Sequence, residues 1–154
     1  LGLAFLNAVT EETEAVIRDT LSLEKEKIVT EPIANYNVFV IDQEFNKNSS
    51  IGLANTNVLR SGEFRDANVS SLVFNLANRK NSYAITGDAS TSTLRENQEY
   101  TTGFASNLAF RKTEGKFRYR LENRFSDEKY DKNDLGFNQT NNYMDFVGNL
   151  SYQI

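Results

Sequence analysis

Charged side chains at alternate positions form the clearest chemical pattern in the sequence, namely Arg118, Arg120, Glu122 and Arg124. Alternate residues of a β-strand point to the same side of the sheet, so this strand would carry a locally positive face. Two interpretations stay open at this point. The face is either the solvated side of a soluble sheet or the wall of a water-filled lumen, which favours anionic solutes or pairs with acidic residues elsewhere.

The other face of the same strand is apolar. Phe117, Tyr119, Leu121 and Phe125 occupy the intervening positions, so the strand separates two different environments. A tight turn at residues 113–116 would place Arg111 and its neighbours opposite the charged row.

Acidic residues offer two further kinds of site. Glu11–Glu12 and Asp127–Glu128 are candidate carboxylate pairs for glycoside chemistry, but both lie at expected turns, where exposed acids are common. Residues 131–137 (DKNDLGF) begin like a calcium-binding loop. Because Leu135 and Asn142 fall at positions where such a loop needs oxygen ligands and a glutamate, an Asx-rich turn is the better interpretation.

The composition removes several classes of function. The chain of 154 residues contains no histidine and no cysteine, so a zinc or haem site, a disulfide or an imidazole-based triad is not expected. The net charge of −4 argues against a nucleic-acid partner, which normally selects a basic surface. We therefore expect no catalytic residues, no cofactor and no metal, and the chain is not predicted to be an enzyme.

Alternation with a period of two dominates the sequence and predicts an all-β chain. Residues 10–31 are less clear: a hairpin turning near Ser22–Lys25 is expected, although residues 11–18 alone also fit a short helix. The other expected strands cover residues 1–9, 36–45, 50–60, 69–77, 82–90, 99–111, 115–125 and 142–154.

The expected connections alternate in length. Short turns are predicted at residues 46–49, 78–81 and 113–116, and longer polar links at 61–68, 91–98 and 127–140. In an up-and-down meander this places all short turns at one end of the sheet and all long links at the other. Bacterial outer-membrane barrels have this asymmetry, and strands of about ten residues match their apolar band.

Four phrases of the sequence together resemble a known family: GLAFLNAVT, EPIANYNVFVIDQEF, NSSIGLANTNVLRSGEFRDANV and YDKNDLGF. They resemble the outer-membrane barrel region of a Bacteroidota family, domain of unknown function 5916, over residues 1–154. In that family the barrel follows a periplasmic, family-9-like carbohydrate-binding domain. The resemblance implies a role at the envelope, in glycan handling or as a partner of other outer-membrane or surface proteins and glycans. It supplies no catalytic residues.

The sequence therefore predicts an antiparallel up-and-down meander that is part of a transmembrane β-barrel in the bacterial outer membrane. We expect residues 1–154 to be a single barrel segment of a longer polypeptide, without the N-terminal periplasmic domain. The predicted function is a porin-like channel or transport protein, or a structural surface component. The alternative is a soluble β-sandwich that binds carbohydrate. The expected lumen-lining residues are Arg118, Arg120, Glu122 and Arg124, and those expected to face the lipid bilayer are Phe117, Tyr119, Leu121, Phe146 and Leu150.

Overall fold

The computed structural model describes residues 1–21, 24–137 and 139–154 of the chain. Within these residues all regular structure is β-strand. The ten strands are β1 (Gly2–Thr10), β2 (Thr13–Arg18), β3 (Lys25–Glu31), β4 (Ala34–Phe45), β5 (Ser49–Arg60), β6 (Asp66–Ala77), β7 (Tyr83–Glu96), β8 (Glu99–Lys112), β9 (Phe117–Ser126) and β10 (Tyr143–Tyr152). None of the described residues forms a helix long and apolar enough to cross a membrane.

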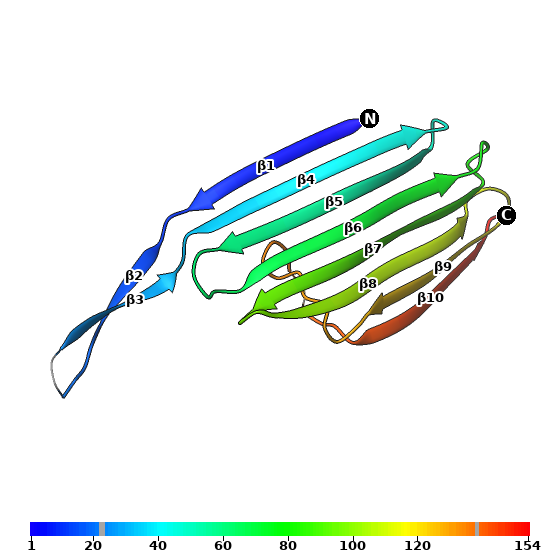
Figure 1. The fold of residues 1–154 in the computed structure, drawn as a ribbon. Helices are drawn as coiled ribbons and strands as arrows, with labels where there is room; N and C mark the ends of the chain where they lie inside the picture. The colour runs from blue at the N-terminus through cyan, green and yellow to red at the C-terminus, as the bar shows by residue number, and fades with distance from the viewer. Residues whose placement is uncertain (22–23, 138) are drawn as a thin grey trace.

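Eight of the strands form one antiparallel sheet in the order β1-β4-β5-β6-β7-β8-β9-β10, and β2 and β3 form a separate two-stranded hairpin. From β4 onward every strand pairs with the next strand along the chain. The predicted all-β antiparallel meander is confirmed, with the β2–β3 hairpin inserted between β1 and β4 (Figure 1).

The short helix considered for residues 11–18 is wrong. Thr13–Arg18 is strand β2, paired with β3. Val16 and Ile17 are β-branched, as are Ile28 and Val29 on the partner strand, and such residues favour a pleated strand over a helix. The predicted tip at Ser22–Lys25 includes residues 22 and 23, which lie outside the described residues.

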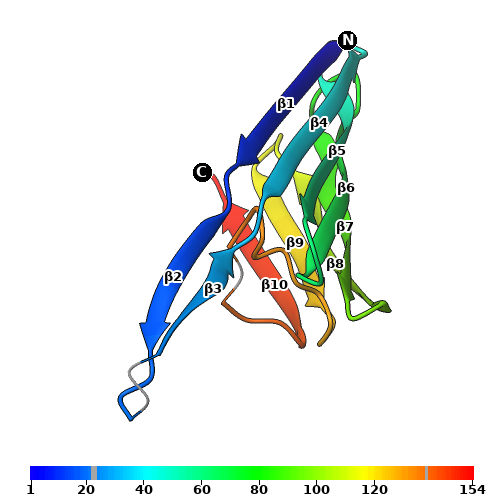
Figure 2. The same ribbon diagram turned by 60° about the vertical axis from the view of Figure 1, so that its left-hand side comes forward.

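The large sheet is curved and open. β1 and β10 are its two edges, and Figure 2 shows both turning toward the same side of the molecule, so that the sheet forms a trough. In the described part of the chain the two edge strands do not pair with each other, and the sheet is not closed into a barrel. An edge strand leaves a row of backbone groups without partners, and native proteins pair, cover or charge such edges.

The short turns gather at one end of the sheet (Figure 1). These turns follow β4, β6 and β8, and residues with positive φ support them: Asn46 and Lys47 in the first, Asn81 in the second and Gly115 in the third. Asparagine and glycine accept the left-handed conformation at little cost. The long connection at residues 127–142 and the β2–β3 hairpin lie at the opposite end.

The predicted strict alternation of short and long connections is wrong for the connection between β7 and β8, which is short. The predicted link at residues 91–98 is strand as far as Glu96, and β8 begins at Glu99. The serine and threonine residues that suggested a loop form ladder pairs with β8, since threonine suits a strand. The reversal needs only Asn97 and Gln98, whose φ angles of 50° and 67° fit a two-residue hairpin turn. Likewise, β6 begins at Asp66 and shortens the predicted link at residues 61–68.

Candidate functional site

The strand register divides the side chains of the sheet between two faces. Residues that pair directly across antiparallel strands point to the same side. Arg120 pairs with Arg111, and Arg124 pairs with Asn107, which in turn pairs with Asp88. We call this side the concave face, because the connection at residues 127–142 lies on it inside the trough (orange in Figure 2). The opposite side is the convex face.

All four residues of the charged row lie on the concave face. Glu122 lies between two arginines: Arg120 Nε donates to Oε2 over 2.9 Å and Arg124 Nε donates to Oε1 over 2.7 Å. The Glu122 side chain is only 7% exposed. Guanidinium groups occupy both of its carboxylate oxygens. Arg118 Nε instead donates to the carbonyl oxygen of Gly115. The expected position of Arg111 opposite this row is confirmed.

The connection between β9 and β10, residues 127–142, folds back onto the concave face. The backbone N–H of Asp131 donates to Ser92 Oγ over 2.9 Å, and Tyr130 forms a hydrogen bond with Ser90. Tyr130 is 6% exposed and Ser92 is fully buried. Burial raises the pKa of the Tyr130 phenol, the hydrogen bond to Ser90 opposes this rise, and nearby Asp88 adds to it.

Gly103 makes this close approach possible. A Cβ atom at position 103 would lie 2.2 Å from the backbone nitrogen of Tyr130 and 2.3 Å from the carbonyl carbon of Lys129. Backbone atoms cannot yield in the way that a flexible side chain can. The seating of the connection on β8 therefore requires glycine at this position.

Two arginines anchor the far side of the connection. Asp134 accepts hydrogen bonds from Arg60 Nη2 and Arg65 Nη2, each over 2.7 Å, and Asp131 lies 3.3 Å from Arg65 Nη1. The Asp134 side chain is 8% exposed. These ion pairs join the β9–β10 connection to the turn between β5 and β6, three strands away in the sheet. We call Arg60, Arg65, Asp131 and Asp134 the clamp.

Asp134→Asn is expected to lower the free energy of unfolding by about 1–3 kcal/mol, because hydrogen bonds between charged partners that are shielded from water contribute about this much. Asn keeps the shape but loses the charge that holds Arg60 and Arg65. Urea unfolding and the rate of tryptic cleavage after Lys129 and Lys132 measure the effect.

Glu14→Gln is the matched control for this substitution. It removes the charge from the Lys27–Glu14 pair, which has the same 2.7 Å separation but is exposed. Exposed pairs contribute about 0–1 kcal/mol. Equal effects of the two substitutions would contradict the anchoring role of Asp134.

A cavity of about 360 Å³ lies between the connection and the concave face. Its wall is mainly polar or small, with Ser71, Asp88, Ser90, Asn107, Arg124 and Lys132 among its residues. Val69, Phe125 and Leu135 are also part of the wall. The charged and polar side chains suit water and hydrophilic solutes.

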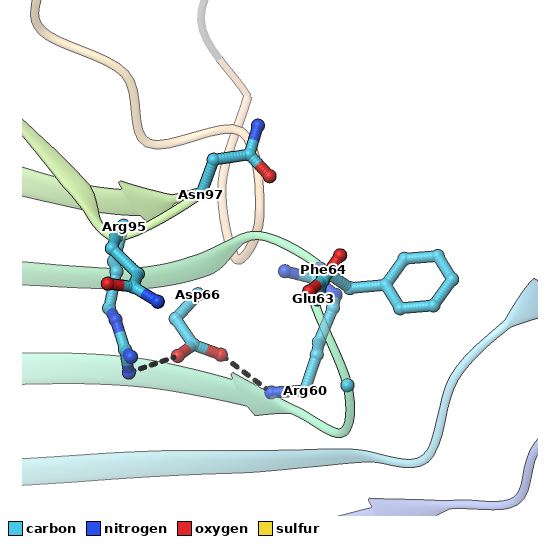
Figure 3. A pocket seen from close by; sticks show the side chains of 8 residues that line it. Arg60, Glu63, Phe64, Asp66, Arg95 and Asn97 are labelled. Carbon is cyan, nitrogen blue, oxygen red and sulfur yellow. Dashed lines mark hydrogen bonds and ion pairs between the residues drawn. The ribbon is translucent and has the colours of Figure 1, made fainter.

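A second cavity of about 360 Å³ lies at the end of the sheet that carries the long connections (Figure 3). Asp66 is central to it: one carboxylate oxygen accepts the backbone N–H of Arg60 over 2.8 Å, and the other lies 3.6 Å from Arg95. Phe64 and Asn97 line its edge. Each carboxylate oxygen of Asp66 therefore has a partner.

The convex face carries the large apolar side chains. The five residues expected to face lipid share it, as the pairs Tyr119–Leu150 and Phe117–Tyr152 show. Phe146 is 77% exposed and Leu150 70%. The same face continues across the sheet with the half-buried Ile41 and with exposed Leu3, Phe5, Phe39, Ile51, Leu53, Leu76, Ile85, Leu108 and Phe110. We call this surface the apolar belt.

An amide-rich zone, which no pattern in the sequence indicates, lies between the apolar belt and the long connections. Asn7 donates to Asn35 Oδ1 over 2.6 Å and to Asn37 Oδ1 over 2.8 Å. On the neighbouring strands Asn55 donates to Asn68 and Ser70. Only the register reveals that these residues adjoin, because they come from four strands.

Asp127 and Asp131 serve as turn and anchor groups. Asp127 Oδ2 accepts the N–H of Phe104 and its Oδ1 accepts the N–H of Lys129. The Asx turn predicted in residues 131–137 is confirmed, because Asp131 Oδ1 accepts the N–H of Asn133 over 2.8 Å. In the described residues no group of three or more acidic side chains is arranged to hold a metal ion.

The family described as a domain of unknown function (DUF5916) matches residues 1–154. No curated protein and no solved structure matches the chain.

Proposed function

We propose that this chain, which belongs to the DUF5916 family, forms part of the wall of a bacterial outer-membrane β-barrel. In this arrangement the apolar belt contacts the lipid bilayer, and the concave face lines the interior of the barrel. The protein acts as a channel or transport protein, or as a structural component of the cell surface linked to glycan handling.

The distribution of large and small side chains is the observation that supports the proposal most directly. The largest fully buried side chains of the described chain are Val58 and Ser92. The other buried residues are mostly alanine and serine, whereas the leucine, isoleucine and phenylalanine side chains of the convex face are mostly exposed. A soluble domain buries its large apolar residues. A continuous exposed apolar surface indicates contact with a membrane or a protein.

The lengths of the strands and the position of the connections agree with this proposal. Strands β4–β10 contain 10–14 residues. Tilted by about 45°, a strand of 9–11 residues spans the apolar part of a bilayer. The short turns then face the periplasm, and the amide-rich zone, the clamp and the long connection lie toward the exterior.

The β9–β10 connection suits the interior of such a barrel. It covers part of the concave face and contacts strands β7 and β8. In barrels, loops that fold inward narrow or fill the lumen. The proposal therefore includes a lumen that this connection narrows near its outer end.

Fractionation of cells that produce the full-length protein tests the proposal. The protein is expected in the outer-membrane fraction, to need detergent for extraction and to migrate differently on a gel before and after boiling. A full-length protein that is monodisperse in solution without detergent would overturn the proposal.

A soluble carbohydrate-binding β-sandwich is the second candidate. It requires a second layer over the apolar belt, because sandwiches bury the inner faces of two sheets. In the described residues the other sheet is the β2–β3 hairpin, which contacts no other strand. The cavity beside Phe64 is the feature that favours this candidate, since an exposed ring next to polar groups suits a sugar. Detergent-free solubility together with saturable glycan binding would establish it.

A further inference from the structure

Two arginines lie directly opposite each other on the concave face. Arg111 of β8 and Arg120 of β9 are register partners. Their Cβ atoms therefore lie about 5 Å apart and point to the same side. Like charges in this position destabilise a strand pair, so the pairing needs a compensating anion.

Two acidic side chains, Glu122 and Asp145, share the concave face of β9 and β10 with these arginines. Glu122 uses both carboxylate oxygens to bind Arg120 and Arg124. Asp145 is the register partner of Arg124. Arg111 faces Ala84 on its other neighbouring strand, and in the described part of the chain it forms no ion pair. The positive charge of Arg111 is therefore not balanced by a protein carboxylate.

One donor of Arg111 is also unsatisfied. Arg111 Nε is buried and has no hydrogen-bond partner among the described residues. A buried polar group without a partner is unfavourable, so native structures satisfy such groups with protein, water or ligand. The adjoining Ala84 and Ala109 carry only methyl groups and offer no side-chain acceptor to the guanidinium.

We propose that Arg111 and Arg120 form a binding site for an oxyanion, such as inorganic phosphate or the phosphate group of a larger solute. Guanidinium groups bind such anions through paired N–H donors. The anion supplies the negative charge that Arg111 lacks and accepts the free hydrogen bond of Arg111 Nε. The site deepens the proposed function and rests on it, because the concave face must be open to water for a solute to reach it.

Isothermal titration calorimetry of the full-length protein in detergent, with inorganic phosphate at low ionic strength, tests the site. Saturable binding is expected, and it should weaken as sodium chloride is added. Arg111→Gln is expected to weaken binding at least tenfold. Arg111→Lys keeps the charge but not the paired donors, and is expected to weaken binding several-fold.

Arg95→Gln is the matched control. It makes the same change of charge at the opposite end of the sheet, where Arg95 lies beside Asp66, and is expected to leave phosphate affinity within twofold. If Arg95→Gln weakens binding as much as Arg111→Gln, the attraction is diffuse and the site is overturned. If Arg111→Gln fails to fold, Arg111→Lys decides, and unchanged affinity in that variant overturns the site. The absence of saturable binding to the folded wild-type protein overturns it as well.

A parallel titration with glucose 6-phosphate distinguishes the source of the anion. Tighter binding of the sugar phosphate assigns the site to a larger solute, and equal or weaker binding assigns it to free phosphate. A protein that needs detergent but does not bind phosphate loses only this inference. A protein that binds phosphate without needing detergent loses the proposed membrane location instead.

Discussion

Leu121→Arg is expected to lower the free energy of unfolding by about 2–4 kcal/mol when the protein is folded in a lipid bilayer. This is the cost of an arginine on the lipid face of a barrel near the midplane of the membrane. Leu121 is 56% exposed, so in a soluble sheet the same substitution would change the stability by no more than about 0.5 kcal/mol. The two proposed environments of the convex face therefore predict clearly different results.

The position of Leu121 makes it the most informative residue for this test. It pairs with Phe110 on β8 and with Gly148 on β10, in the middle of the apolar belt. Replacing it neither opens a packed core nor breaks a hydrogen bond of the side chain. Urea unfolding of the protein in vesicles, followed by tyrosine fluorescence or by gel migration, measures the change.

Thr102→Arg is the control for Leu121→Arg. Thr102 lies on the same face, on strand β8, beside Thr93 and close to the turn at Asn97–Gln98. An arginine near the membrane surface costs about 0–1 kcal/mol. The face assignment is wrong if Leu121→Arg is no more harmful than Thr102→Arg.

Gly103→Ala is expected to lift the β9–β10 connection from the concave face and to lower the stability by about 1–3 kcal/mol, the usual cost of overpacking. The added methyl group would meet the backbone of Lys129 and Tyr130 at 2.2–2.3 Å. Because the clash is with backbone atoms, the connection has to move as a unit. Faster tryptic cleavage after Lys129 and Lys132 and weaker protection of the amide of Asp131 from hydrogen exchange are the expected signs.

Gly148→Ala is the matched control, with the same chemical change on β10. A Cβ atom there would meet only Leu121 Cδ2, at 3.8 Å, which is an ordinary van der Waals contact. This variant is expected to leave cleavage of the connection unchanged. If Gly103→Ala also leaves it unchanged, the connection does not rest on β8 as described.

Gly103 and the clamp both hold the β9–β10 connection against the concave face, and so both affect the size of the proposed lumen. If the concave face lines a lumen, both Gly103→Ala and Asp134→Asn release the same connection from different ends. Their effects on cleavage should then be less than additive, because residues that hold one structural unit are energetically coupled.

Local patterns in the sequence predict the strands and their faces. The alternation of Phe117–Arg118–Tyr119–Arg120–Leu121–Glu122 assigns each side chain to one side of β9, and the register confirms that assignment. Asparagine and glycine at the short turns predict three of the reversals. The alternation fails at residues 91–98, where serine and threonine suit either a loop or a polar strand, and only pairing with β8 decides between them.

The sequence by itself determined that the chain is an antiparallel meander with one apolar and one polar face, because strand periodicity is a local property of neighbouring residues. Only the tertiary structure decided that the β9–β10 connection folds onto the polar face, held by Gly103 and by Arg60 and Arg65. Only the tertiary structure showed the unbalanced charge of Arg111, which depends on what its neighbouring strands present. These contacts join residues up to 74 positions apart, and no local pattern encodes such pairings.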